Sequence, residues 1–438
     1  ISVLHVYAEQ KNRDKSPTCP CCGHHMHVHG HSKHTLKDFP VIPRKRLLIT
    51  FDLLRYFCPN CSHTCTEQID IKYPNTSITK RAALWIASLL EFRVSISAIS
   101  KISGIDWAVI KKLNHGHIKK ELELHRKLLR GTNYKPTYIA VDEFAIKKGH
   151  EYATSIMDIH TGEIYWIGKG RSTAAFEKCF HEIDVDFLSN VKAVAMDMHQ
   201  PYENVIRKHL PHVEIVFDKF HVLAQYGKDV LGAVRLAKAR EHLEQANSLK
   251  EELEDFKQQH KDELKKDSSL VTIVDTFKQN IKEHLDLKNI FKSLRWVLLS
   301  ASAKLTELQK EKLDDILSRH EDLAICYSMR EELKLIYDID NPDVARVMWE
   351  QWFTAAKASN IPQLIRFAEQ KEKRIDGLVA YAKHPITTAK LEGTNNKIKV
   401  LKRIAFGYRD DEYFFDVIKY NSVFDNSSEF LQSSLTLF

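Results

Sequence analysis

The sequence of 438 residues contains no long hydrophobic run and few cysteines outside one short segment. No stretch approaches the about 18 consecutive apolar residues that a membrane-spanning helix requires. No secretory signal precedes the first motif, so we expect a cytoplasmic protein. Because the chain begins at Ile1 and not at Met, we expect its natural start to be shortened. Internal repeats and low-complexity tracts are also missing, which argues against a repeat protein.

The eight cysteines are distributed unevenly along the chain. Six lie between Cys19 and Cys65, and only Cys179 and Cys326 lie elsewhere. Clustered cysteines at short spacing, in a chain without an export signal, are typical of metal binding in a reducing compartment. The spacing therefore predicts metal ligands and not disulfides.

Two pairs of cysteines have the spacing of metal-binding knuckles. The pairs are Cys19 with Cys22 and Cys58 with Cys61, and residues 47–57 between them have the pattern of a strand. Four thiolates are the usual ligands of a closed structural zinc site, so the segment predicts a zinc ribbon that binds Zn²⁺. Cys21 and Cys65 are spare thiols, and six histidines lie between His24 and His34. Replacement of one cysteine ligand by a spare cysteine or a nearby histidine stays open.

Length limits the number of domains, and net charge indicates the class of partner. A chain of 438 residues is long enough for two or three domains. The net charge of +7 and the pI of about 8.8 fit a polyanionic partner without proving one.

The segment 97–113 has the spacing of a helix-turn-helix. Ala98, Ile99 and Ile102 are predicted to face inward on the first helix, and Ile105 to fill the turn. Gly104 can adopt the positive φ of the turn, and Asp106 is a suitable N-cap for a second helix over about 107–114. The candidate DNA contacts on this recognition helix are Lys111, Lys112 and Asn114. A plain helical hairpin has the same periodicity and is the alternative.

Residues 138–217 alternate short apolar segments with turns and helices. Strands are predicted at residues 138–142, 151–157, 163–168, 191–197 and 213–217, and helices at about 173–183 and 201–209. Three strands, a helix, a strand, a helix and a strand is the order of the ribonuclease-H-like fold. Because the first and fourth strands of that fold are neighbours, Asp142 and Asp197 at their ends should lie close together.

Paired carboxylates repel each other unless a cation lies between them, and such oxygen ligands favour Mg²⁺ or Mn²⁺. A third acid, Glu392, lies on a later basic helix. Metal ions held by three carboxylates can activate a water or a 3′-hydroxyl and stabilise the leaving oxygen of a phosphodiester. One strand that ends in Asp is weak evidence, whereas two at these positions followed by Glu392 are much stronger.

Asp197 and Glu392 are 195 positions apart, which predicts a helical insertion over about 228–383. The segment around Lys250 is expected to be a solvated charged face, with coiled-coil pairing as the alternative. Arg295 and Trp296 could stack on an unpaired nucleotide, although a core tryptophan is the more common case. The helix near Glu392 carries four basic residues, Lys397, Lys399, Lys402 and Arg403. We expect them to contact DNA phosphates, and a solvated basic face is the alternative.

The combined motifs resemble those of bacterial insertion-sequence transposases of the DDE type, in the ISL-three group. The matching pieces are Cys-Pro-x-Cys-Gly from Cys19, Arg-Tyr-Phe-Cys-Pro-Asn-Cys from Arg55, Ala-Val-Asp-Glu-Phe from Ala140, Met-Asp-Met from Met196, Asp-Lys-Phe-His from Asp218, Leu-Glu-Gly-Thr-Asn-Asn-Lys-Ile-Lys from Leu391 and Lys-Arg-Ile-Ala-Phe-Gly-Tyr-Arg from Lys402. The resemblance implies a head that reads terminal inverted repeats and a core in which Asp142, Asp197 and Glu392 hold divalent metal. It also implies strand cleavage at the element's ends, followed by strand transfer. Asp218 and His221 belong to a motif that resembles one of the family. Three roles stay open for these two residues: contact with the metal, support of the site, or packing alone.

The sequence thus predicts an α/β, ribonuclease-H-like core with a large helical insertion, preceded by a zinc ribbon and a helix-turn-helix. The expected limits are 1–73 for the ribbon, 74–132 for the helix-turn-helix, 133–227 and 384–420 for the core, 228–383 for the insertion and 421–438 for a loosely ordered tail. The expected partner is double-stranded DNA bound by a homodimer or larger assembly, in association with the bacterial nucleoid. Two alternatives remain, a nuclease that only hydrolyses DNA and a DNA-binding regulator without chemistry.

Overall fold

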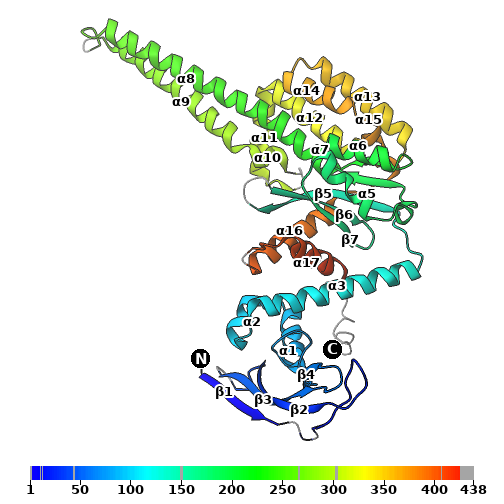
Figure 1. Ribbon diagram of the computed structural model, residues 1–438. Coiled ribbons are helices and arrows are strands. Elements are labelled where there is room, and N and C mark those ends of the chain that lie inside the picture. Colours follow the sequence, from blue (N-terminus) through cyan, green and yellow to red (C-terminus); the bar gives the residue numbers. More distant parts are fainter. Residues whose placement is uncertain are drawn as a thin grey trace. The chain divides into compact units, whose positions relative to one another are not determined.

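The computed structural model describes residues 2–9, 11, 13–42, 45–147, 151–264, 267–300, 304–405 and 407–424 (Figure 1). Residues 425–438, most of the predicted tail, lie outside this part. The described residues of 1–134, 162–167 and 392–438 form one compact unit, and those of 135–161 and 168–391 form a second. None of the helices in the described ranges combines the length and the apolar character needed to cross a membrane.

The first unit begins with a four-stranded sheet. Its strands are β1 (Ser2–Ala8), β2 (His27–Asp38), β3 (Lys45–Phe57) and β4 (Thr64–Thr66). The order is β1-β3-β2 with β4 also paired to β3, and β2 and β3 are antiparallel. The strand predicted at residues 47–57 is confirmed as the central strand β3. Met26, Leu54 and Tyr56 pack with Cys19 and Cys58 in a small core beneath the cysteine knuckles.

Three helices follow: α1 (Lys80–Glu91), α2 (Ile96–Ser103) and α3 (Trp107–Gly131). The predicted turn is confirmed, because Gly104 ends α2 with a φ of 71° and Ile105 is buried in the core of the three helices. The prediction that Ile102 faces inward is wrong, because Ile102 is 50% exposed. Asp106 is the N-cap residue of α3, as predicted, but its side chain makes no capping hydrogen bond and instead accepts one from Lys37 Nζ at 3.1 Å.

The second helix of this motif is much longer than predicted, because it packs against the C-terminal end of the chain. Helix α3 has 25 residues, and its Ile118 and Leu122 contact Tyr413 and Val417 of α17 (Asp411–Phe424). The final helical stretch is divided into α16 (Ala389–Ile404) and α17. The expectation of a loosely ordered tail from residue 421 is wrong for residues 421–424, which continue α17.

A five-stranded sheet has the order β7-β6-β5-β8-β9, and its strands β5, β6, β8 and β9 belong to the second unit. The strands are β5 (Tyr138–Lys147), β6 (Glu151–Asp158), β7 (Ile164–Lys169), β8 (Ala193–Met196) and β9 (Glu214–Phe217). β5 is antiparallel to β6 and parallel to β8, and β8 is parallel to β9. The first and fourth strands are neighbours, as predicted. The prediction that the first strand ends at Asp142 is wrong, because β5 continues to Lys147 in its pairing with β6.

Helices connect these strands at the predicted places. α6 (Gln200–His209) follows β8, and the helix predicted at 173–183 is divided into α4 (Thr173–Glu177) and α5 (Cys179–Glu182), with the short turn η1 (Val185–Leu188) after it. Pro201 lies in the first turn of α6, where its missing N–H costs no hydrogen bond. Tyr202, Val205 and Ile206 form the buried face of that helix.

The segment predicted as a helical insertion is mainly helical in its described residues. Its elements are α7 (Lys219–Tyr226), the π-helical turn η2 (Gly227–Gly232), α8 (Ala233–Gln259), α9 (Ser268–Ser293), α10 (Arg295–Leu299), α11 (Glu307–Arg319), α12 (Glu321–Ile336), α13 (Pro342–Ala358), α14 (Pro362–Glu372) and α15 (Ile375–Lys383). Helices α8 and α9 form a long hairpin (Figure 1). Lys250 is exposed while Leu253 packs with Val274 and Ile281 of α9, so the charged face and the helix pairing coexist.

Gly377 allows α15 to approach β9 closely, and a larger residue there should destabilise the second unit. A Cβ atom at Gly377 would lie 2.3 Å from Cε2 of Phe217, a buried ring that cannot move aside easily. Overpacking of this kind costs about 1–3 kcal/mol, which we expect Gly377→Ala to show as a lower free energy of unfolding in urea. Gly116→Ala on α3 is the control, because nothing lies within 4 Å of its Cβ position. Equal stability of both variants would contradict the close approach.

Candidate metal centres

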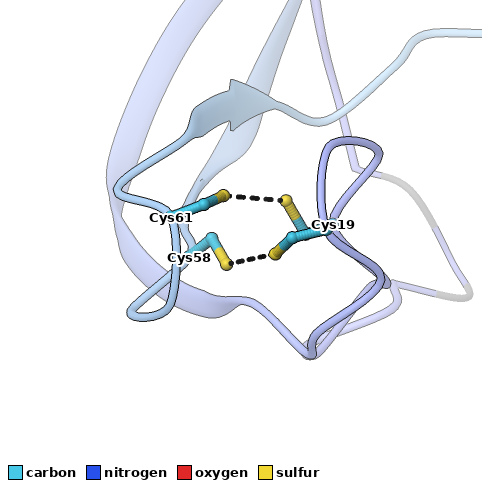
Figure 2. Close-up of side chains that lie close together, drawn as sticks. Cys19, Cys58 and Cys61 are labelled. Atoms are coloured by element: carbon cyan, nitrogen blue, oxygen red, sulfur yellow. Dashed lines mark hydrogen bonds between the residues drawn. The ribbon is translucent and has the colours of Figure 1, made fainter.

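The four cysteines of the two knuckles gather at one point of the first unit. Cys19 Sγ lies 3.6 Å from Cys61 Sγ, and Cys22 Sγ lies 3.5 Å from Cys58 Sγ (Figure 2). All four sulfur atoms lie within 4.8 Å of one another. A tetrahedron with zinc–sulfur bonds of about 2.3 Å has edges of about 3.8 Å, so the arrangement fits a single Zn²⁺ ion.

The surroundings of these thiols act on their pKa values in opposite directions. Hydrogen bonds from the backbone N–H of His24 and from the side chain of Asn60 lower the pKa of Cys22 to about 5, which favours the thiolate that zinc binds. Despite a hydrogen bond from the backbone of His63, the neighbouring thiols raise the pKa of Cys61 to about 12. The two spare thiols are neighbours of the four-thiol group but do not belong to it: Cys21 is exposed, and Cys65 Sγ lies 3.7 Å from Met26 Sδ. None of the described histidines joins the four-thiol group.

The first two predicted carboxylates come from adjacent parallel strands. Val141 of β5 is paired with Met196 of β8, and the next residue on each chain is Asp142 and Asp197. Asp142 is 9% exposed and accepts a hydrogen bond from the backbone N–H of Glu143 at 2.7 Å. Burial raises the pKa of Asp142 to about 6, and the charge of Asp197 contributes to this rise. The two strands therefore bring two carboxylates close enough to repel each other.

His221 of α7 also contacts this centre. Its Nδ1 atom lies against Oδ1 of Asp197, and this contact raises the pKa of His221 to about 9. His221 thus offsets part of the negative charge of this pair. A divalent cation fits the rest of the donor set, because it would relieve the remaining repulsion and binds carboxylate oxygens preferentially.

Asp218 is a structural clamp between distant segments of the second unit. As the N-cap of α7, its Oδ1 accepts hydrogen bonds from the N–H groups of Phe220 and His221 at 2.7 and 3.1 Å. Its Oδ2 accepts two more from Thr388, from the backbone N–H at 2.5 Å and from Oγ1 at 2.9 Å. A buried carboxylate with four donors is fully satisfied.

The clamp fixes the start of α16, the helix that carries Glu392. Lys390 strengthens the attachment, because its Nζ donates to the carbonyl oxygens of Ile159 and His160 at 3.0 and 2.6 Å. Leu391 is fully buried. Glu392 follows directly, in the first turn of α16, and is exposed.

The predicted DNA-contacting residues of α3 differ in their surroundings. Lys111 Nζ pairs with Asp410 Oδ2 at 2.5 Å, and Asn114 Nδ2 donates to Tyr413 Oη at 2.6 Å. These side chains hold the end of the chain against α3, whereas Lys112 is exposed. DNA contact by all three residues stays a prediction.

The other predicted DNA contacts lie mostly at the surface. Trp296 is 71% exposed with Arg295 over its ring, so the alternative of a core tryptophan is wrong. On α16, Lys397, Lys399 and Arg403 are exposed, and Lys402 is half-buried. Burial lowers the pKa of Lys402. Their contact with phosphate stays a prediction.

A second possible group of metal ligands was not predicted from the sequence. His115 Nε2 lies 2.9 Å from Asp416 Oδ2, close to Glu412. Glu412 is paired with Lys119 at 2.6 Å, so its charge is already balanced by a lysine. The ligands come from α3 and α17, almost 300 positions apart, and no local spacing could have revealed them.

Comparison with known proteins identifies the family of this chain. A family model described as transposase, for the ISL-three group of DDE enzymes, matches residues 139–418. The transposase for insertion sequence element IS1001 of Bordetella parapertussis is 31% identical over 399 residues, which cover 91% of this chain and 86% of that protein. The transposase for insertion sequence element IS1557 in two strains of Mycobacterium tuberculosis is 22% identical over 274 residues, 63% of this chain and 57% of that protein.

The protein is thus a DNA transposase. More particularly, the chain belongs to the DDE transposases of the ISL-three group, as the motifs indicated. Membership implies binding, cleavage and transfer of DNA, with a divalent metal ion.

Proposed function

We propose that Asp142, Asp197 and Glu392 together hold Mg²⁺ or Mn²⁺ and cut and rejoin DNA at the ends of an insertion sequence. The observation that carries the proposal is the adjacency of the first two carboxylates on the parallel strands β5 and β8. The strand order and directions support a ribonuclease-H-like core. When bound, the metal activates the attacking oxygen and stabilises the leaving oxygen of the phosphodiester.

The residues around these acids would fix their positions. His221 holds one oxygen of Asp197, and Asp218 orients α7 and anchors the start of α16. We propose that Glu392, four residues after Thr388, supplies the third carboxylate. In this arrangement His221 and Asp218 are positioning residues.

The first unit would recognise the DNA ends. We propose that the four-thiol group is a zinc ribbon and that α2, the turn at Gly104 and α3 form a helix-turn-helix, with Lys112 as its most accessible candidate contact. Arg295, Trp296 and the basic residues of α16 would contact DNA elsewhere. The domain limits predicted from the sequence remain part of this proposal, as does an assembly of at least two subunits that pairs two DNA ends.

A strand-transfer assay tests the proposal. The full chain with Mg²⁺ is given a pre-cut transposon end, a labelled strand and a target plasmid. Joining of the 3′-hydroxyl to the plasmid is the expected result. Nicking without joining would favour the hydrolytic nuclease, and binding without either reaction would favour the non-catalytic regulator.

Asp218→Ala should lower DNA cleavage without weakening DNA binding. The change leaves the N–H and Oγ1 of buried Thr388 without an acceptor, which costs about 1–3 kcal/mol, and releases the start of α16. We expect kcat to fall by about 10-fold or more while KM for DNA changes little. Thr388→Val is the matched control, because it removes one hydroxyl and keeps the backbone hydrogen bond. A defect in Asp218→Ala no larger than that of the control would contradict the clamp.

A further inference from the structure

A polar cavity of about 520 Å³ lies beside the acidic centre, entirely within the second unit. Its wall includes Met198, the residue directly after Asp197, and side chains from α6, α7 and the junction of α14 and α15. Aromatic side chains do not contribute to the described lining. The wall is therefore suited to hydrogen bonding and charge, and not to the stacking of a base.

Lys371 is the unusual residue of this cavity. It is 2% exposed, and its Nζ contacts Gln225 Oε1 at 2.5 Å and the thioether of Met198 at 3.2 Å. Among the described residues, no carboxylate lies within ion-pair distance of this ammonium group. Burial and the charge of Arg374 lower the pKa of Lys371 to about 8, although Asp229 and Asp197 favour the charged form from beyond ion-pair distance. An anionic partner in direct contact with the ammonium group would stabilise this buried charge further.

The other charged groups of the wall leave a positive surplus. Glu203 pairs with Arg374 at 2.9 Å, and Asp376 pairs with Arg346 at 2.7 Å. Both acids of the lining are thus neutralised within the protein. Arg207 and Lys373 make no ion pair in the described part of the chain, and with Lys371 they present three cations to one cavity.

We propose that this cavity binds a backbone phosphate of the DNA strand next to the phosphodiester that is cut, with Lys371 as the central phosphate contact. The inference rests on the proposed function of Asp197, whose neighbour Met198 places the cavity beside the acidic centre. The lining suits a phosphate better than a base, because cationic and amide side chains surround the cavity and no aromatic ring belongs to its described lining. Lys371 is thereby a positioning residue that sets the register of the strand.

Chemical modification of single phosphates tests this proposal. Methylphosphonate, which is neutral, is placed at each position around the cleavage site, and cleavage is measured with the wild type, Lys371→Met and Lys371→Arg. We expect one position where the modification slows the wild type about 10- to 100-fold, as loss of a charge-assisted hydrogen bond does. At that position Lys371→Met should show no further loss, because the same contact is already absent. Lys371→Arg should keep part of the effect.

Binding in EDTA gives a second readout that does not depend on cleavage. Loss of one phosphate contact should lower the slope of log affinity against log salt concentration by about 0.9 in Lys371→Met. Lys357→Met is the control, because Lys357 is exposed and paired with Glu372 at 2.7 Å. A thermal melt verifies that each variant folds.

The outcomes separate the two proposals. If the wild type cleaves unmodified DNA but no phosphate position is coupled to Lys371, and the salt slope is unchanged, the cavity does not bind phosphate. If Lys371→Met shows the expected change in salt slope but the wild type never cleaves DNA, the catalytic proposal fails and the phosphate site stands.

Discussion

Asp197→Asn is expected to reduce DNA cleavage by about 10³-fold or more, because removal of one ligand charge costs about 4 kcal/mol of transition-state stabilisation. The substitution keeps the shape of the side chain and its place after β8, so the sheet should remain folded. DNA binding through the first unit should be unchanged. Single-turnover cleavage in saturating Mg²⁺, together with a binding assay, measures both effects.

Substitution of either of the other two carboxylates should also reduce DNA cleavage, whereas substitution of a surface acid should not. Asp142→Asn and Glu392→Gln are expected to give losses of the same order, because each would remove a ligand of the same metal centre. Asp275→Asn on α9 is the control, since Asp275 lies at the surface and pairs with Lys278 of the same helix. Retention of cleavage by Asp197→Asn would disprove the catalytic assignment. Retention by Glu392→Gln alone would leave two acids and require another third ligand.

Cys58→Ser should remove zinc and abolish specific recognition of the transposon ends. Cys58 is completely buried beside Cys22, and the small core around Met26, Leu54 and Tyr56 has little other support. Metal binding supplies about 10–16 kcal/mol to comparable zinc domains, far more than such a core can replace. We expect affinity for the terminal repeats to fall about 10³-fold, to the level of non-specific DNA binding.

Metal content distinguishes ligands from their neighbours. Mass spectrometry of the native protein should find one zinc per chain in the wild type and in Cys21→Ser, because Cys21 is exposed and outside the four-thiol group. Cys58→Ser should contain none. Zinc loss in Cys21→Ser with retention in Cys58→Ser would reverse the ligand assignment. Hydrogen exchange should localise the unfolding to the segment around β2 and β3.

Features encoded by neighbouring residues could be predicted from the sequence. The thiol pairs have a fixed local spacing, and the left-handed turn at Gly104 needs a residue without a Cβ atom. The strands and helices of residues 138–217 follow from local apolar patterns. Asp142 was nevertheless placed at a strand end, because the sequence does not reveal that β6 continues to pair with β5 beyond it.

Features that depend on distant partners were missed or left open. Lys111 and Asn114 have the pattern of exposed recognition residues, yet their partners Asp410 and Tyr413 lie 299 positions away. Ile102 fits the apolar face of α2 in the sequence, but it is 50% exposed, whereas Ile99 of the same predicted face is buried in the core of the three helices. Lys371 resembles any helical lysine in the sequence, and only the fold reveals its burial beside Met198.

The clamp between Asp218 and Thr388 cannot form until both residues have been synthesised, which delays completion of the acidic centre. The two residues are 170 positions apart. A ribosome adds about 5–20 residues per second, so about 10–30 s separate the appearance of the carboxylate from that of its partner. Until then Oδ2 of Asp218 must remain hydrated, because an unpaired buried carboxylate is too costly. A chain released early, anywhere within the insertion, would therefore carry the four-thiol head but an unfinished acidic centre.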